Sequence, residues 1–281
     1  MNSLPNPSGV PEKPPWKLKM TVAYEGTQYS GWQTQKTGIG VQQKLEEALG
    51  QLFPRPKVVH SSSRTDTGVH ALGMVVHVEI PRHELKMPPR KLLLALNAHL
   101  PEDIRVMAVS RCREDFHARF SAVGKEYRYL VWNHPAMNPL WRHCAWHVPQ
   151  KLDFQRMKIA ARHFEGTHDF RALAANRNYP FTNTVRTLAC CRLQRRGPMI
   201  TIILRGSGFL YKMCRGIVGT LVQVGQNKIS PGDIVRILDS RDRRLAGMSA
   251  PAHGLVLWKV CYGPTRPTPA ARSHSAIASE P

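Results

Sequence analysis

Two kinds of apolar pattern alternate along the chain and limit the folds that it can adopt. Residues 41–52 carry apolar side chains at helical spacing, and a second helix is predicted over residues 89–99, where Pro89 falls at a tolerated start. Around these helices, residues 18–24, 74–80 and 104–111 are rich in strand-forming residues. A chain that interleaves both kinds of element folds as a sheet with helices packed on it.

The second half of the chain has a similar order of elements, although its sequence does not repeat the first half. Its expected helices are a segment that begins near residue 153 and residues 209–224 and 231–238. The expected strands that accompany them are residues 127–132, 188–193, 199–204 and 255–262. This order predicts two α+β halves whose antiparallel strands join into one broad sheet, with a central cleft and helices on the other side.

Composition divides the chain into four segments. Residues 1–16 are rich in proline and lack an apolar core, so we expect a disordered leader and no secretory signal. Residues 17–150 form the first α+β half and residues 151–263 the second. The small, polar and proline-rich residues 264–281 predict a disordered tail.

The charge of the chain points to an anionic partner. Lysine and arginine number 40 against 19 acidic residues, which gives a formal charge of +21. Nucleic acid is the first candidate partner for such an excess, and an anionic membrane surface is the second. No basic amphipathic stretch stands out, and no run of about 18 apolar residues predicts a transmembrane helix.

Cysteine and histidine are scattered through the sequence. None of the six cysteines belongs to a Cys-x-x-Cys pair, and the thirteen histidines include no His-Glu-x-x-His motif. The sequence therefore predicts no metal site and no cofactor. Scattered cysteines in a chain of this size predict reduced thiols and a cytoplasmic location.

The stretch Ser62 to Ala71, SSRTDTGVHA, is the strongest candidate for chemistry. Asp66 stands in a loop that enters a strand, a common place for catalytic residues. If Arg64 and Asp66 are locally extended, their side chains point to the same side. An arginine beside a carboxylate favours the ionised form, which suits a nucleophile or a general base. The alternative is a structural aspartate that caps a turn, since an Asp-x-Gly sequence is typical of turns.

A glycine-containing stretch, residues 206–216, follows a strand and opens a helix. It resembles a dinucleotide-binding fingerprint, but Tyr211 stands where that fingerprint needs its third glycine. The strand before it also belongs to an expected hairpin and not to a βαβ unit. A helix start with basic residues could equally receive an RNA phosphate.

Five motifs in order resemble those of the tRNA pseudouridine synthase A (TruA) family. The first is the loop around Asp66, from Arg64 to Ala71. The others are Asp115–Ala122 with Tyr127–Tyr129 after it, Gly166–Phe170, Phe209–Arg215 and Ala250–Leu255. The resemblance covers about Lys17 to Gly263. Cys214 departs from the pattern, because valine is usual there, and this puts local packing in question.

The resemblance implies a fold and a role for each candidate residue. The fold would be two ferredoxin-like halves around an RNA-binding cleft, in a chain that is usually a homodimer. Asp66 matches the catalytic aspartate, as nucleophile or base, and Arg215 matches the arginine that pairs with it. Tyr127 would pack on the target base, and Arg64 would fill the gap left when the nucleotide turns out of its stack. The substrate would be tRNA, at uridines 38 to 40 of the anticodon stem-loop, with no cofactor or metal.

Three alternatives stay open on the sequence. An aspartic protease is one, because Asp66-Thr67-Gly68 spells its triplet, although no second copy occurs and the chain is strongly basic. A non-catalytic RNA-binding protein on the same scaffold is another, although it would be expected to have lost Asp66. The third is a pseudouridine synthase that acts on another RNA.

Overall fold

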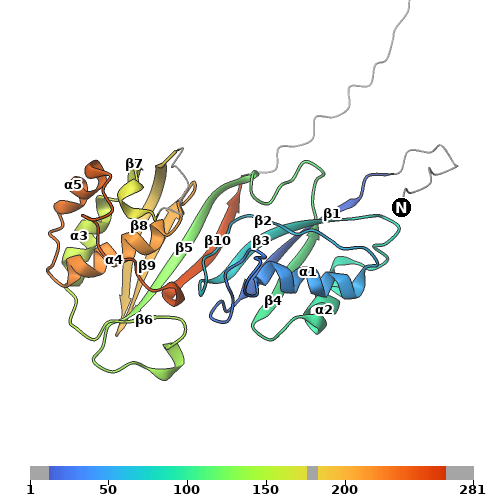
Figure 1. Cartoon of the computed structure of the whole chain (residues 1–281), viewed down its shortest axis with the longest axis horizontal. Coiled ribbons are helices and arrows are strands. Elements are labelled where there is room, and N and C mark those ends of the chain that lie inside the picture. Colours follow the sequence, from blue (N-terminus) through green and yellow to red (C-terminus); the bar gives the residue numbers. More distant parts are fainter. Residues whose placement is uncertain (1–12, 176–182, 264–281) are drawn as a thin grey trace, which may run out of the picture.

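The computed structural model describes residues 13–175 and 183–263. Residues 1–12 of the expected leader and the whole of the expected tail lie outside this range. Among the described residues, ten strands form one sheet, with strand order β4-β1-β3-β10-β5-β9-β8-β7, while β2 pairs with β3 and β6 with β5. Figure 1 shows this sheet running the length of the molecule, with α1 and α2 on one half and α3, α4 and α5 on the other.

The strands match the order expected from the sequence, with differences at their ends. Those of the first half are β1 Trp16–Tyr24, β2 His60–Ser61, β3 His70–Ile80 and β4 Ile104–Arg111. Those that follow are β5 Ala122–Trp132, β6 Trp146–His147, β7 Gly166–Asp169, β8 Val185–Arg196, β9 Met199–Gly206 and β10 Leu255–Tyr262. Among the described residues, seven of the nine strand pairings are antiparallel, and β8 and β9 form the expected hairpin.

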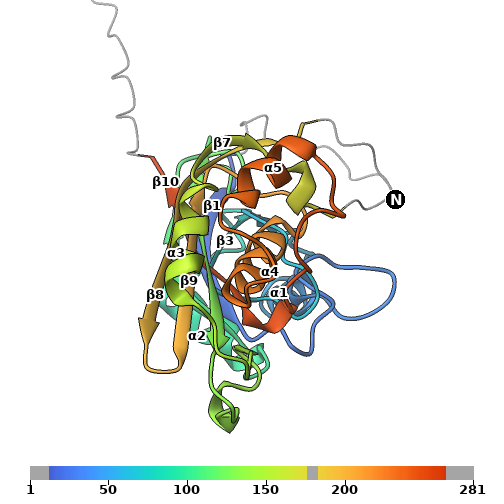
Figure 2. The same ribbon diagram turned by 90° about the vertical axis from the view of Figure 1, so that its left-hand side faces the viewer.

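Two of the helices have the bounds that the sequence predicts. The α-helices are α1 Val41–Leu52, α2 Pro89–His99, α3 Phe154–Arg162, α4 Met213–Gly225 and α5 Asp233–Ser240. Single 3-10 turns cover η1 Pro139–Trp141, η2 Arg171–Leu173 and η3 Ala252–Gly254. In the turned view, α1 and α4 overlap on the same side of the strands, as the predicted layer of helices requires (Figure 2). The prediction of a mixed α+β fold with one broad sheet is confirmed.

The start of α4 differs from the prediction. The sequence pattern predicts a helix from residue 209, but α4 begins at Met213. Lys212, directly before it, has a φ of 59°, in the left-handed region that a long side chain rarely adopts. This backbone turn separates residues 209–212 from the helix, so they line a groove together with the Asp66 loop instead of continuing α4.

The two halves meet at a narrow joint. Strand β10 lies between β3 and β5, and its parallel pairing with β3 joins Val256 to His70 and Leu257 to Ala71. Further along β3, the short strand β2 takes the neighbouring position, where His60 pairs with His77. The sheet therefore opens beyond the joint, and the Asp66 loop lies directly before the paired end of β3.

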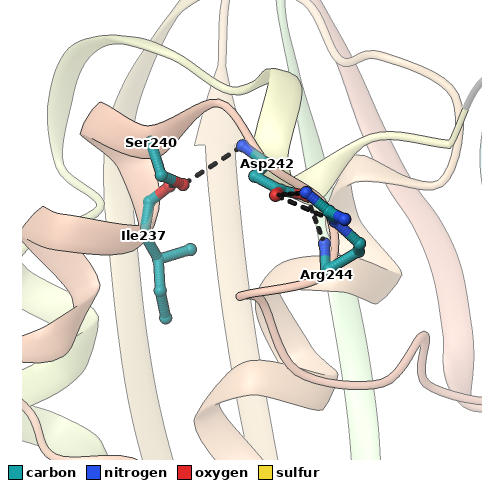
Figure 3. A network of polar contacts seen from close by, with 4 residues as sticks. All are labelled: Ile237, Ser240, Asp242 and Arg244. Carbon is teal, nitrogen blue, oxygen red and sulfur yellow. Dashed lines mark hydrogen bonds and ion pairs between the residues drawn. The ribbon is translucent and has the colours of Figure 1, made fainter.

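The end of α5 is held by a local polar network (Figure 3). The Ser240 hydroxyl donates to the Ile237 carbonyl at 2.7 Å and accepts from the Asp242 backbone N–H at 3.1 Å. The Asp242 carboxylate accepts from the backbone and guanidinium of Arg244, with a shortest distance of 2.6 Å. These bonds end the helix in an exposed turn, at the far end of the second half from the joint.

In the described segments, no helix has both the length and the apolar character that a membrane-spanning helix needs.

Candidate active site

A groove of about 540 Å³ lies where the two halves meet. Its wall combines the Asp66 loop with residues of α1 and β2 on one side, and residues of β5 and the segment before α4 on the other. The basic residues in the wall are Arg64, Arg119, Lys125 and Lys212, whereas Asp66 is the one acidic residue among those that line it. Four basic side chains and a single carboxylate therefore line the groove, which makes its surface positively charged.

The Asp66 loop is held by contacts with the segment that follows β1. Gly31 has a φ of 91°, and a Cβ there would lie 2.5 Å from the Thr65 carbonyl oxygen, so only glycine lets the two segments approach this closely. The Trp32 backbone N–H donates to that carbonyl, and the Tyr24 hydroxyl bonds the Thr65 hydroxyl at 2.7 Å. Gly68, with a φ of 76°, allows the turn that follows Asp66. The carboxylate is thus carried by a loop with a fixed shape.

Asp66 and Arg215 face each other across the joint. The Nη1 atom of Arg215 donates to Oδ2 of Asp66 at 3.4 Å, and both side chains are mostly buried. Arg215 lies in the first turn of α4, and its Nε also donates to the Ala250 carbonyl at 2.7 Å. One side of the guanidinium is therefore anchored to the backbone, and the other reaches the carboxylate. A cation in this place favours the ionised form of an aspartate.

Tyr127 comes from β5 and closes the same part of the groove. Its hydroxyl lies 3.0 Å from the Ser63 Oγ, and the Phe209 ring meets its ring edge-on with centroids 5.0 Å apart. Burial raises the pKa of Tyr127 above its ordinary value, with the neighbouring Cys214 adding to the shift. The phenol therefore keeps its proton at neutral pH. Burial also raises the pKa of the Cys214 thiol, so this residue stays uncharged beside Asp66.

All four residues singled out from the sequence are near the groove. Asp66, Arg64 and Tyr127 line it, and Arg215 reaches it through its ion pair. The side chain of Arg64 is exposed to solvent. Sequence reasoning missed Ser63, Lys125 and Phe120. The position of Lys125, two residues before Tyr127 on one strand, is a signal that could have found it, because such residues share a face.

Three histidines gather at the outer end of the groove without forming a metal site. The rings of His60, His77 and His117 lie 4.7 to 5.8 Å apart. The Nδ1 atom of His77 accepts the Ala118 backbone N–H at 3.1 Å, and burial lowers the pKa of His77 to about 4. Within residues 13–175 and 183–263, no group of three or more metal-ligating side chains is placed to hold an ion.

Comparison with known proteins identifies the family. The sequence profile described as tRNA pseudouridine synthase matches residues 20–121 and 160–263 of this chain. The chain belongs to the tRNA pseudouridine synthase family. Arg64, Asp66 and Arg215 lie within the matched segments, whereas Tyr127 falls between them. Because the chain belongs to this family, the hypothesis that it is an aspartic protease is excluded.

Individual relatives are similar over nearly their whole length. The chain is 45% identical to a tRNA pseudouridine synthase A of Geobacillus kaustophilus over 248 residues, which cover 88% of this chain and 94% of the relative. It is 41% identical to that of Exiguobacterium sibiricum, with coverage of 88% and 96%, and 42% identical to that of Chlamydia trachomatis, with coverage of 88% and 92%. The tRNA pseudouridine synthase similarity thus includes both halves of the fold.

Proposed function

We infer that this chain converts uridine to pseudouridine in tRNA. The observation that carries this inference is the ion pair of Arg215 with Asp66, whose carboxylate lines a basic groove in a member of the tRNA pseudouridine synthase family. The reaction breaks the bond between N1 of the base and C1′ of the ribose, turns the base, and joins C5 to C1′. The proton of C5 is lost and N1 gains one, so the change is an isomerisation.

The groove contains side chains that can carry out the steps of this reaction. The ionised carboxylate of Asp66 acts close to C1′, either as a nucleophile on the sugar or as a base, and Arg215 keeps it charged and in place. A target uridine must leave its base stack to reach a carboxylate in a groove. Arg64, exposed at the groove wall, fills the space that the base vacates.

Tyr127 supplies the wall against which the freed uracil turns. Its ring is fixed by Phe209 and by the Ser63 hydroxyl, so it can stack on the base without moving. Its phenol remains protonated because burial raises its pKa, which leaves a hydroxyl able to assist proton transfer at C5. The basic residues of the wall bind the RNA backbone, so affinity falls as salt rises.

Three finer assignments belong to the same proposal. The modified uridines are those at positions 38 to 40 of the anticodon stem-loop, the enzyme is a homodimer, and it works in the cytoplasm. The unpaired state of all six cysteines is consistent with a reducing compartment. Mapping of modified positions in tRNA from cells with and without the gene, and sedimentation of the purified chain, test the first two assignments.

The activity test is tritium release from bulk tRNA labelled at C5 of uridine, with no metal or nucleotide added. Wild type is expected to release tritium and Asp66→Ala to release none, while both bind the tRNA in a gel shift. Release by both proteins would remove Asp66 from the reaction. Binding without release by wild type would favour the RNA-binding alternative, and release from another RNA alone would favour a synthase with a different substrate.

A further inference from the structure

An apolar ring stands in solvent at the outer end of the groove. Phe120 is 76% exposed, yet it lines the groove that holds Asp66. Its ring lies 4.4 Å from that of His117, and the Arg119 guanidinium lies 5.6 Å from its centroid. An exposed aromatic ring next to basic side chains is typical of surfaces on which nucleic-acid bases stack.

The turn that carries Phe120 is rigid. His117 Nδ1 accepts the backbone N–H groups of both Arg119 and Phe120, at 3.1 and 3.3 Å. The Ser121 side chain accepts the His117 N–H at 3.0 Å, and the Tyr262 hydroxyl donates to the Ala118 carbonyl at 2.7 Å. A ring presented on a turn with this many bonds loses little conformational freedom when a ligand covers it, which favours binding.

The Lys125 ammonium group lines the same groove as this turn. Lys125 is half-buried in the groove wall, and burial lowers its pKa, with Arg119 adding to the shift. Within the described part of the chain its side chain makes no hydrogen bond or ion pair. Buried charges are normally paired, so an ammonium group in this position fits an anion supplied by a ligand. Lys125 and Tyr127 are two positions apart on β5, which corresponds to about 7 Å along the strand.

We propose that Phe120 and Lys125 form a subsite for the nucleotide next to the target uridine. The neighbouring base stacks on Phe120, and the adjoining phosphate pairs with Lys125. This rests on the proposed function, because it takes the target uridine to lie at Asp66 and Tyr127. The subsite gives the enzyme a hold on the strand outside the catalytic centre, which keeps the RNA in place while the target base turns.

The first test compares Phe120→Ala and Phe120→Trp with wild type on full-length tRNA. Alanine is expected to lower kcat/KM for tritium release about tenfold, since stacking of one base is lost, and tryptophan is expected to restore it. Val235→Ala, an exposed apolar residue of α5 far from the groove, is the control and keeps wild-type kinetics. Equal kcat/KM for Phe120→Ala and wild type would overturn the proposal.

The second test removes the neighbouring base. Transcripts are ligated so that the nucleotide on the 5′ or the 3′ side of the target uridine lacks its base. On one of these two RNAs, wild type is expected to lose about the same tenfold as Phe120→Ala, and Phe120→Ala is expected to lose nothing more. If the two losses add on both RNAs, Phe120 does not contact a neighbouring base and the proposal fails.

The third test isolates the phosphate. Lys125→Gln should reduce the slope of log KM against log salt by about 0.7, the value for one phosphate of a single strand. An unchanged slope would overturn the role of Lys125. A Phe120→Ala chain that loses activity because it sediments as a smaller species would place Phe120 in a protein interface and reject the subsite. Failure of wild type to release tritium from any tRNA would instead reject the proposed function.

Discussion

Two aspartate–arginine pairs in this molecule differ in almost every respect. Asp242, which is half-buried, and Arg244, which is exposed, are two residues apart and joined through several bonds, the shortest of 2.6 Å. Asp66 and Arg215 are 149 residues apart, mostly buried, and in contact at 3.4 Å between Nη1 and Oδ2. The local pair has the better geometry, and it closes a turn at the end of α5. The distant pair has the longer contact, and it lies in the groove.

The comparison shows that the pair with the shorter hydrogen bonds is not the pair at the candidate site. The Asp242 carboxylate spends its lone pairs on Arg244, so little of it is left for another molecule. Arg215 donates to the Ala250 carbonyl through Nε and to Asp66 through Nη1, which places its guanidinium beside a carboxylate that lines the groove. The Asp66 carboxylate, unlike that of Asp242, lines the basic groove, where a ligand can reach it.

The same substitution at both aspartates tests this contrast most directly. Asp66→Asn is expected to lower the turnover rate at least about 10³-fold, because an amide is neither a base nor an effective nucleophile. Its Kd for tRNA stays within about threefold of wild type, because binding depends on the basic wall. Asp242→Asn, the matched control, keeps wild-type turnover. Tritium release and gel shift on the three proteins give the result, and equal losses at both sites would contradict the distinction.

Replacement of Arg215 is expected to have the second-largest effect on turnover. Arg215→Lys keeps the positive charge but cannot hold both Ala250 and Asp66, so kcat is expected to fall about a hundredfold through misplacement of the carboxylate. KM changes little. Arg244→Lys, at the local pair, leaves both constants unchanged. Steady-state kinetics on tRNA distinguish the two, and a rise in KM alone for Arg215→Lys would make this residue a phosphate contact.

The bond between Ser63 and Tyr127 gives a smaller effect on the same site. Ser63→Ala removes one hydrogen bond from the tyrosine and is expected to lower kcat about fivefold. Tyr127→Phe removes the same bond from the other side. Because both changes delete one interaction, the double variant should lose less than the product of the single losses. Strict multiplication of the two losses would show that Ser63 does not act through Tyr127.

The smallest expected effect is a change in thermal stability at low pH, which the Asp242–Arg244 pair causes. Hydrogen bonds from Arg244 lower the pKa of Asp242 to about 2 from 3.8. A carboxylate with a lowered pKa in the folded state stabilises it above pH 3.8, and this contribution is lost between pH 3.8 and 2. Thermal melting of wild type and Asp242→Asn should therefore differ slightly at pH 7 and converge at pH 2. A difference that grows toward pH 2 would reverse the expected sign.

The regular part of the fold could be predicted from the sequence. Helices α1 and α2 have the expected bounds, because apolar spacing and a tolerated Pro89 define them locally. The start of α4 was predicted wrongly, because the apolar pattern continues through residues 209–212 while the backbone of Lys212 leaves the helical region. Strand β7 was also missed, because its four residues depend on pairing with β8 more than on their own composition.

The site was predicted in part, and mostly through resemblance. The Asp66 loop stands out in the sequence, but nothing local in it names Arg215 as its partner, since that contact depends on how the two halves join. Ser63 could not be identified as a contact of Tyr127 without the fold for the same reason. Phe120 could not be recognised as a candidate, because the sequence does not show which phenylalanine side chains are exposed to solvent.

The narrow joint between β3 and β10 has a consequence for synthesis of the chain. A ribosome that has passed α5 has already made Asp66, Tyr127 and Arg215, yet the strand that lies between β3 and β5 is still inside the exit tunnel or unmade. Until residues 255–262 emerge, the nascent chain holds two half-sheets with open edges. The candidate site is therefore completed only at the end of translation, and a premature stop after residue 245 yields Asp66, Tyr127 and Arg215 without the strand that joins the two halves.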